Sequence, residues 1–302
     1  ALLAGLIAYL VVGGPALADM VTLGTAKDNT LYEDAQGDRS NGAGQYFFVG
    51  KTGPLAIELR RGLVQFDIAG NVPAGVTIDS VRLRLHMSKT NSLGQNVSLR
   101  RVLADWGEGA SDAAGEEGAG GPAAAGDATW LHQFFNTTTW AAPGGDFSGT
   151  VSATTNVTTI GFYNWGSTPQ MRMDVQGWLD NPASNFGWIL IGNEAATGNA
   201  QRFTAKEDTI PANRPSLVVH YSIPVGCACP FQSDLDENGF VDATDLAFVI
   251  DIVFFGASDL QDPDCPRTRA DFNADGFADA TDLAFLIDHV FFGGPGPVDP
   301  CL

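Results

Sequence analysis

The stretch Asp234-Leu-Asp-Glu-Asn-Gly-Phe-Val-Asp-Ala-Thr-Asp245 returns 37 residues later as Asp271-Phe-Asn-Ala-Asp-Gly-Phe-Ala-Asp-Ala-Thr-Asp282. Aligning residues 234–256 with 271–293 gives 16 identities in 23 positions. Internal similarity at a fixed period indicates two copies of one supersecondary unit. The C-terminal part of the chain is therefore predicted to be a duplicated module.

Both copies place oxygen-bearing side chains at loop positions 1, 3, 5, 9 and 12, and glycine at position 6. Calcium takes six to eight oxygen ligands, position 7 supplies a backbone carbonyl, and glycine permits the sharp bend. This order predicts two EF-hand-type calcium sites. Position 12 is Asp instead of the usual Glu, so the next helix has to lie closer to the ion. The alternative is a stack of Asx-turns on a solvated acidic surface. The expected ligands are Asp234, Asp236, Asn238, Phe240, Asp242, Asp245, Asp271, Asn273, Asp275, Phe277, Asp279 and Asp282.

A helix is expected after each loop, because apolar residues follow at helical spacing. The residues expected to pack the two helices together are Leu246, Val249, Ile250, Val253, Leu283, Leu286, Ile287 and Val290. The phenylalanines exceed what so small a core needs, so some should be exposed and mark a partner surface, or else pack on the rest of the protein. These are Phe248, Phe254, Phe255, Phe285, Phe291 and Phe292.

The doubled loop, its position-12 Asp and the short helices resemble a type I dockerin over about residues 234–294. The resemblance implies docking to a cohesin domain on a scaffold. Loop positions 10 and 11 are Ala-Thr in both copies, and the helices offer Asp251 and Asp288 but no Lys or Arg. Well-known dockerins use Ser or Thr there and basic residues along the helix, so a different surface partner stays open.

Charge is concentrated in the same region. Residues 19–222 hold 20 acidic and 14 basic residues, a net of −6, whereas residues 223–302 hold 15 and 2, a net of −13. Such a field attracts cations and repels nucleic acid and anionic membranes. No nucleic-acid partner is expected.

All four cysteines lie late, at Cys227, Cys229, Cys265 and Cys301. An even number in one small module of an exported protein indicates two disulfides, with three possible connectivities. A thiol metal site is the alternative, although the Cys-Ala-Cys spacing differs from zinc hairpins.

Residues 1–18 are interpreted as a signal peptide without its basic start, because an apolar run ends at Ala16-Leu17-Ala18, a small-x-small cleavage pattern. A transmembrane anchor is the alternative and needs about 20 apolar residues. The sequence thus predicts a secreted, extracellular or cell-surface protein with no membrane span after cleavage.

Residues 21–222 are predicted to form an antiparallel β-sandwich of jelly-roll type, followed by a linker at 223–230 and the α-helical calcium module at 231–302. Alternation or continuous apolar character predicts strands at 63–68, 82–87, 188–192 and 216–221. One helix is expected over 173–179, and residues 107–126, rich in Gly and Ala, are predicted to be a long surface loop.

Landmarks across this block resemble the DNRLRE family, also described as carbohydrate-binding module family 96. They are Asp28-Asn29-Thr30-Leu31-Tyr32-Glu33, Arg61-Gly62-Leu63-Val64-Gln65-Phe66, Ile78-Asp79-Ser80-Val81-Arg82-Leu83, Asp105-Trp106-Gly107-Glu108, Asn185-Phe186-Gly187-Trp188, Phe203-Thr204-Ala205-Lys206-Glu207 and Arg214-Pro215-Ser216-Leu217. The resemblance implies a jelly-roll sandwich that binds extracellular polysaccharide, with some members linked to acidic glycans.

Sugars stack on exposed aromatic faces, and acidic sugars also need Arg or Lys. The glycan-binding candidates are Trp106, Trp130, Trp140, Tyr163, Trp165, Arg202 and Lys206. No catalytic motif is visible, so the leading hypothesis is a non-catalytic glycan-binding sandwich on a calcium-dependent docking module. A tethered glycoside hydrolase or lyase and a structural or adhesive protein remain alternatives.

Overall fold

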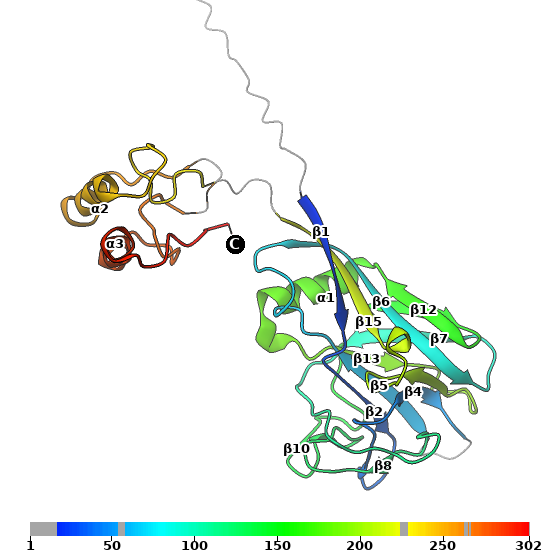
Figure 1. Cartoon of the computed structure of the whole chain (residues 1–302). Helices are drawn as coiled ribbons and strands as arrows, with labels where there is room; N and C mark the ends of the chain where they lie inside the picture. The colour runs from blue at the N-terminus through cyan, green and yellow to red at the C-terminus, as the bar shows by residue number, and fades with distance from the viewer. Residues whose placement is uncertain (1–16, 54–57, 224–228, 263–264, 266, 302) are drawn as a thin grey trace, which may run out of the picture. The chain divides into compact units, whose positions relative to one another are not determined.

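A computed structural model describes residues 17–53, 58–223, 229–262, 265 and 267–301. The described chain falls into two compact units (Figure 1). Residues 18–222 form a sandwich unit, and the second unit, the docking module, is described from Cys229 to Cys301. The expected signal peptide lies largely outside the described residues, although strand β1 already includes Leu17 and Ala18.

Eleven strands of the described residues form one curled sheet. The pairings from β15 to β11 along the path are antiparallel. The path is β1 (Leu17–Gly24), β15 (Ser216–Ile223), β6 (Thr77–Thr90), β14 (Gln201–Thr204), β4 (Tyr46–Lys51), β5 (Leu59–Gln65), β13 (Trp188–Ile191), β7 (Gln95–Arg101) and β11 (Ala153–Val157). Two strands branch from it: β12 (Gly161–Gly166) pairs with β6, and β2 (Lys27–Tyr32) pairs with β5.

Strand β4 joins the two halves of the curl, because residues 46–49 pair with β14 while Gly50 and Lys51 pair with β5. The halves pack face to face. The Trp165 indole of β12, in one half, donates a hydrogen bond to the Val97 carbonyl of β7, in the other, at 2.8 Å. The predicted mainly β, antiparallel sandwich is therefore confirmed.

Burial along the strands follows the sequence pattern. Strand β6 alternates buried and accessible residues through the predicted 82–87 segment. In β13, Trp188, Ile189 and Leu190 are all buried, as a continuous apolar run predicts. The strand expected over 63–68 ends at Gln65, and Phe66 and Ile68 continue as buried loop residues.

A second layer of side chains covers the outer surface of β2, β5 and β13. Leu31, Leu63 and Ile189 on those strands pack against Trp106, Trp130 and Trp140 from the long segment between β7 and β11. The predicted loop at 107–126 lies in the same segment between β7 and β11 and is only partly a surface loop. Its Glu117 is buried, and the Glu117 carboxylate accepts hydrogen bonds from the backbone of Gln45 and Tyr46.

The short elements of the unit lie in its connections. They are β3 (Arg39–Ser40) paired with β8 (Gly121–Pro122), β9 (His132–Phe134) paired with β10 (Thr138–Thr139), and the 3₁₀ turns η1 (Pro182–Ser184) and η2 (Pro211–Asn213). Helix α1 (Pro169–Asp180) contains the predicted 173–179 helix and is capped by the Thr168 hydroxyl.

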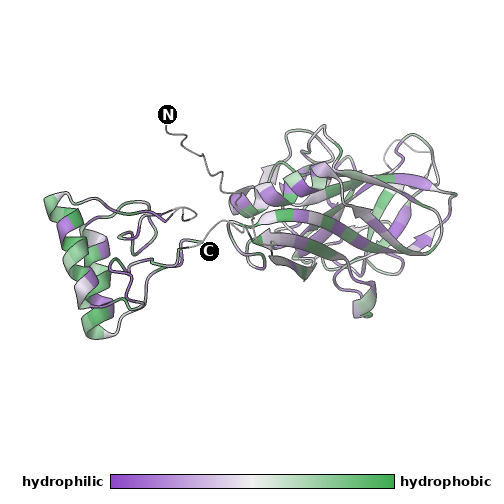
Figure 2. Ribbon diagram, turned by 90° about the horizontal axis from the view of Figure 1, so that it is seen from above, coloured by the Kyte–Doolittle hydropathy of each residue, from purple (hydrophilic) through white to green (hydrophobic). Residues whose placement is uncertain are grey.

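The docking module contains α2 (Ala243–Phe255), α3 (Ala280–Ile287) and the π-helical turn η3 (Asp288–Phe292). The two helices start 37 residues apart, which is the sequence period. They lie side by side (Figure 1), and the helical ribbon of this module is largely hydrophobic (Figure 2). Six of the eight residues expected between them, all but Ile250 and Ile287, join the core cluster, together with Ala270 and Phe272 ahead of α3.

Candidate calcium sites and docking surface

The N-terminal loop, residues 234–245, gathers three carboxylates. Oxygens of Asp234, Asp236 and Asp245 all lie within 4.8 Å of one another. Asp234 and Asp245 are 6% and 0% exposed. The backbone shapes this cradle: the amide of Gly239, at φ +89°, donates to Asp234 Oδ2 at 2.8 Å, and the amide of Leu235 donates to Asp245 Oδ1 at 2.6 Å.

The C-terminal loop, residues 271–282, has a similar set of backbone hydrogen bonds, although the second bond starts from loop position 3 and not from position 2. The amide of Gly276, at φ +103°, donates to Asp271 Oδ2 at 2.9 Å, and the amide of Asn273 donates to Asp282 Oδ1 at 3.1 Å. Position 3 is Asn273 here, and Asp275 takes position 5. The two loops therefore have similar geometry, and the single amide side chain stands at position 5 (Asn238) in the N-terminal loop and at position 3 (Asn273) in the C-terminal loop.

Helix caps fix the last two ligand positions. Asp242 and Asp279 are the N-caps of α2 and α3 and accept from the amides of Thr244 and Thr281 at 2.7 Å. The position-12 carboxylate closes a capping box, because Asp245 Oδ2 accepts from the Asp242 amide at 2.9 Å. Position 12 is thus held against the loop by the helix start itself, as its shorter Asp side chain requires.

The cluster fits calcium. Ligands lie about 2.3–2.6 Å from this ion, so oxygens on opposite sides are roughly 5 Å apart. The 4.8 Å limit in the N-terminal loop meets this spacing. Burial raises the pKa of the Asp282 carboxyl, and the neighbouring Asp271 and Asp275 carboxylates raise it further. Buried like charges of this kind are stabilised by a bound cation.

A disulfide joins Cys229 to Cys265 and ties the start of the docking module to the segment before the C-terminal loop. Cys301 is also disulfide-bonded, and its sulfur lies 3.7 Å from that of Cys229. Cys227 lies outside the described residues. The expectation of disulfide bonding is therefore confirmed for Cys229, Cys265 and Cys301.

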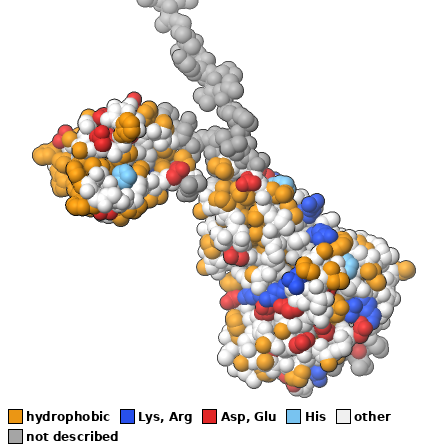
Figure 3. Space-filling model, viewed as in Figure 1, with side chains coloured by type: hydrophobic (Ala, Val, Ile, Leu, Met, Phe, Trp, Pro, Cys, Tyr) orange, Lys and Arg blue, Asp and Glu red, His pale blue; other side chains and the backbone are white. Residues whose placement is uncertain are grey.

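The six candidate partner residues are all exposed, by 43–78%. They repeat in pairs, so Phe248, Phe254 and Phe255 on α2 correspond to Phe285, Phe291 and Phe292 on α3 and η3. Figure 3 shows hydrophobic side chains gathered on this module. Phe240 and Phe277, expected only as carbonyl ligands, are each 72% exposed and add to the apolar surface.

Most of the proposed glycan-binding residues prove unsuitable. Trp106 and Trp165 are fully buried, and Trp130 and Trp140 are 8% and 5% exposed, because their rings fill the sandwich core and the outer layer. The prediction for these four is wrong. Tyr163 is half-buried, and its hydroxyl accepts from the amides of Thr158 and Thr159.

The two basic candidates are neutralised within the protein. Arg202 pairs with Glu116 at 2.7 Å and stacks over Tyr46. Lys206 pairs with Glu108 at 2.7 Å and with Glu207 at 3.4 Å. Neither charge is available as an unpaired group for an acidic sugar.

The sequence pattern did not indicate two residues that border the calcium loops. Arg267 lies 3.9 Å from Asp271, and Arg269 contacts both Asp262 and Glu237. The composition could have indicated them, because Arg267 and Arg269 are the only Lys or Arg residues in 223–302, beside 15 Asp and Glu residues. When an acidic module contains so few positive charges, each of them is expected to pair with a carboxylate.

Two acidic loops, each followed by a capped helix, have the arrangement expected of a duplicated module with calcium loops of the EF-hand type. Residues 232–291 match the family model of the dockerin type I domain, so the chain carries a type I dockerin there. Type I dockerin domains bind calcium, a dockerin implies a cohesin partner, and proteins with dockerins are typically extracellular or at the cell surface. No family match supports the DNRLRE resemblance of residues 21–222, and no curated protein matches the chain. In the described residues, no helix is long and apolar enough to cross a membrane.

Proposed function

We propose that the protein is secreted, that residues 231–302 bind two calcium ions, and that this ordered module docks the sandwich onto a cohesin-type or other surface partner. The observation that carries the proposal is the carboxylate cluster of buried Asp234, half-buried Asp236 and buried Asp245 in a loop that the chain repeats. The proposed ligands are the twelve residues predicted from the sequence, with Phe240 and Phe277 contributing carbonyl oxygens.

Calcium binding and partner binding are linked by the helices. Each ligand loop ends in the capping box of α2 or α3, and those helices and η3 bear the exposed phenylalanines. An ion that orders the loop therefore orders the aromatic surface. Exposed aromatic side chains are the usual anchors of protein interfaces.

The test is calorimetric titration of the calcium-depleted full chain, followed by capture on an immobilised panel of type I cohesins with calcium or with EDTA. We expect two ions per chain and capture only with calcium. The control is a double variant, Asp234→Asn with Asp271→Asn, that removes position 1 from both loops. The proposal would be contradicted if the chain bound no calcium, or if cohesin captured the chain equally well in the presence of EDTA.

We further propose that the sandwich binds an acidic extracellular polysaccharide. The supporting observation is a strip on the outer face of β6 and β12, formed by Arg82, Arg84, His86 and Phe162. Arg84 lies opposite Asn164, and His86 opposite Phe162. The Arg84 guanidinium is 3.6 Å from the Phe162 ring centroid, and Phe162 is 44% exposed.

In the part of the chain that the structure describes, Arg82 and Arg84 form no ion pair. In Figure 3, Lys and Arg side chains lie on the face where Figure 1 shows β6, β12 and β15. The strip thus combines unpaired cations with an aromatic surface on a unit whose net charge is −6. Carboxylated sugars need both kinds of group.

The test is affinity electrophoresis of the full chain through gels that contain acidic or neutral polysaccharides, with product analysis of the same samples. We expect an acidic polysaccharide to retard the protein without being cleaved. The Arg82→Gln/Arg84→Gln variant should not be retarded. An Arg100→Gln/Arg101→Gln variant is the charge-matched control. Cleavage would favour the tethered enzyme, and no retardation in any gel would favour a structural spacer.

A further inference from the structure

The two calcium loops differ in the charges around them. The N-terminal loop has four carboxylate ligands, Asp234, Asp236, Asp242 and Asp245, and also contains Glu237. The Glu237 carboxylate pairs with Arg269, which in turn pairs with Asp262 at 2.6 Å. Six carboxylates and one guanidinium therefore give this loop and its contacts a formal charge of −5.

The C-terminal loop also has four carboxylate ligands, Asp271, Asp275, Asp279 and Asp282. The residue that matches Glu237 is Ala274, which carries no charge. Arg267 is the charged neighbour of this loop, with its Nε 3.9 Å from Asp271 Oδ2. Four carboxylates and one guanidinium give a formal charge of −3, two units less negative than the N-terminal loop.

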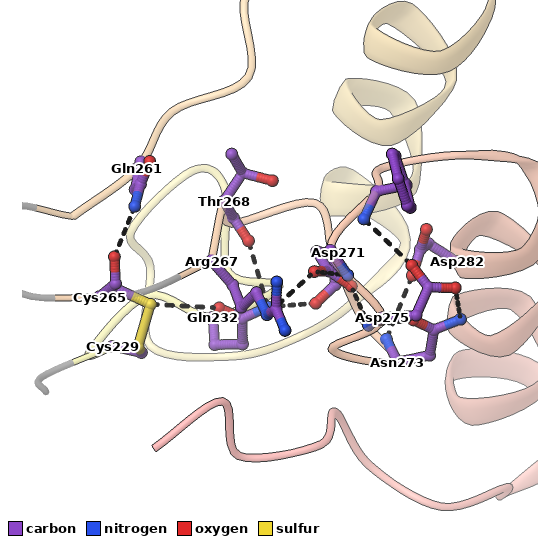
Figure 4. Close-up of polar contacts among 12 residues, drawn as sticks. Cys229, Gln232, Gln261, Cys265, Arg267, Thr268, Asp271, Asn273, Asp275 and Asp282 are labelled. Atoms are coloured by element: carbon purple, nitrogen blue, oxygen red, sulfur yellow. Dashed lines mark hydrogen bonds and ion pairs between the residues drawn. A yellow bond between two sulfur atoms is a disulfide. The ribbon is translucent and has the colours of Figure 1, made fainter. Parts of the chain in front are cut away.

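Arg267 lies over the bend of the C-terminal loop. A Cβ atom added at Gly276 would be 2.8 Å from Arg267 Nη1, and the Gly276 amide donates to the same Asp271 oxygen that faces Arg267. Figure 4 shows the Arg267 side chain directed toward Asp271, with Asn273, Asp275 and Asp282 around the same loop. The guanidinium thus touches a position-1 carboxylate that is 1% exposed.

The N-terminal loop has no equivalent of Arg267. The residue one period earlier is Pro230, and the equivalent of Arg269 is Gln232. Among the described residues, no Lys or Arg forms an ion pair with a ligand of the N-terminal loop. The repeat therefore gives both loops the same ligand chemistry but places a cation against a ligand carboxylate in only the C-terminal loop.

We infer that the two loops bind calcium with different affinities, that the N-terminal loop fills first, and that Arg267 sets the difference. The inference rests on the proposed two-calcium module. Repulsion between a guanidinium and a divalent ion a few ångströms away weakens binding at the C-terminal loop, whereas the surplus carboxylates around the N-terminal loop favour it.

The experiment is a calcium titration of the isotopically labelled, calcium-depleted full chain, followed by the NMR signals of the Gly239 and Gly276 amides. Each amide donates to its loop's position-1 carboxylate, so each reports its own site. We expect the Gly239 signal to saturate at lower calcium than the Gly276 signal. Removing the charge in Arg267→Gln should raise the calcium affinity of the C-terminal loop by about 3- to 10-fold. The calcium concentrations at which the two signals saturate should then lie closer together.

Two controls separate charge from structure. Arg267→Lys keeps the cation and should keep the order of filling, and Arg82→Gln removes a cation from the sandwich and should change neither signal. Added salt should also reduce the difference in calcium affinity between the two loops, since it screens exposed charges. If the Gly276 signal saturates first, or if Arg267→Gln leaves the gap unchanged, the inference is wrong. If either glycine fails to respond, the proposed two-site function fails instead.

Discussion

At the scale of single residues, buried carboxylates have opposite roles in the two units. In the docking module they cluster in a loop that is proposed to bind calcium. In the sandwich unit Asp174, 1% exposed, is a hydrogen-bond acceptor that joins α1 to β13. Its Oδ2 accepts from the Trp188 indole at 2.9 Å and from the Ser152 hydroxyl.

We predict that Asp174→Ala destabilises the sandwich unit by about 2–4 kcal/mol, because two buried donors lose their acceptor. The measurement is chemical denaturation of the full chain followed by tryptophan fluorescence. Asp180→Ala, at the exposed end of the same helix, is the control and should cost less than about 0.5 kcal/mol. Equal costs for both variants would contradict the role assigned to Asp174.

Asp28 illustrates the cost of a buried charge. Burial raises the pKa of the Asp28 carboxyl well above its ordinary value, and the neighbouring Glu207 raises it further. The folded state therefore holds the Asp28 proton more tightly than the unfolded state. Stability from this group is lost as the pH rises from the ordinary pKa of Asp toward the raised value.

We predict that Asp28→Asn becomes more stable relative to the natural protein as the pH is raised from 4 to 7. The amide keeps an oxygen to accept the Lys206 amide hydrogen, which now bonds Asp28 Oδ2 at 2.9 Å. Thermal melts at a series of pH values measure the difference. The exposed Asp112→Asn variant should show a constant difference, and a flat difference for Asp28→Asn would refute the prediction.

At the scale of elements, α2 and α3 with η3 present two kinds of apolar residue. Val249 and Leu286 are 2% and 1% exposed and form the core between the helices, whereas Phe255 and Phe292 are 78% and 77% exposed. The same helical repeat thus supplies both the contact that folds the module and the surface proposed for the partner.

We predict that Phe255→Ser with Phe292→Ser leaves the melting temperature of the module nearly unchanged but weakens cohesin capture at least tenfold, since exposed aromatic anchors act in binding and not in folding. Leu286→Ala is the matched comparison and should destabilise the module by about 2–5 kcal/mol. Unaltered capture by the phenylalanine variant would remove these residues from the partner surface.

At the scale of the whole molecule, each unit has its own hydrophobic cluster, and the proposed calcium sites and the Cys229–Cys265 disulfide all belong to the docking module. The Cys229–Cys265 bond closes a separation of 36 residues. Loop-closure entropy assigns about 3–4 kcal/mol to such a cross-link. Calcium at 100 times its dissociation constant adds about 2.7 kcal/mol for each site.

We predict that EDTA, and separately a reductant, lowers the melting transition of the docking module and leaves the sandwich transition in place. Differential scanning calorimetry of the full chain measures both transitions. The Asp234→Asn/Asp271→Asn variant should melt like the natural protein in EDTA. A module transition that does not respond to EDTA would show that calcium is not part of the folded module.

Local sequence patterns were sufficient to predict much of the secondary structure. The period of 37 residues predicted the two loops and helices, and alternation in residues 82–87 predicted a strand, because these signals depend on neighbours in the sequence. The positions of Trp106 and Trp165 could not be predicted in this way. Whether an indole is exposed or packed depends on which distant strand or loop covers it.

The sequence by itself determined the order of oxygen-bearing residues in the two repeated loops, the helix that follows each loop and the mainly β character of residues 21–222. Each of these follows from residue spacing along the backbone, which sets which side chains share a turn or a face. Only the tertiary structure decided that four tryptophans are core, that Arg202 and Lys206 are paired with carboxylates, and that Arg267 lies against the C-terminal loop alone. Those outcomes depend on groups that are distant in sequence and meet only when the chain packs, since burial and charge pairing are properties of the packed neighbourhood.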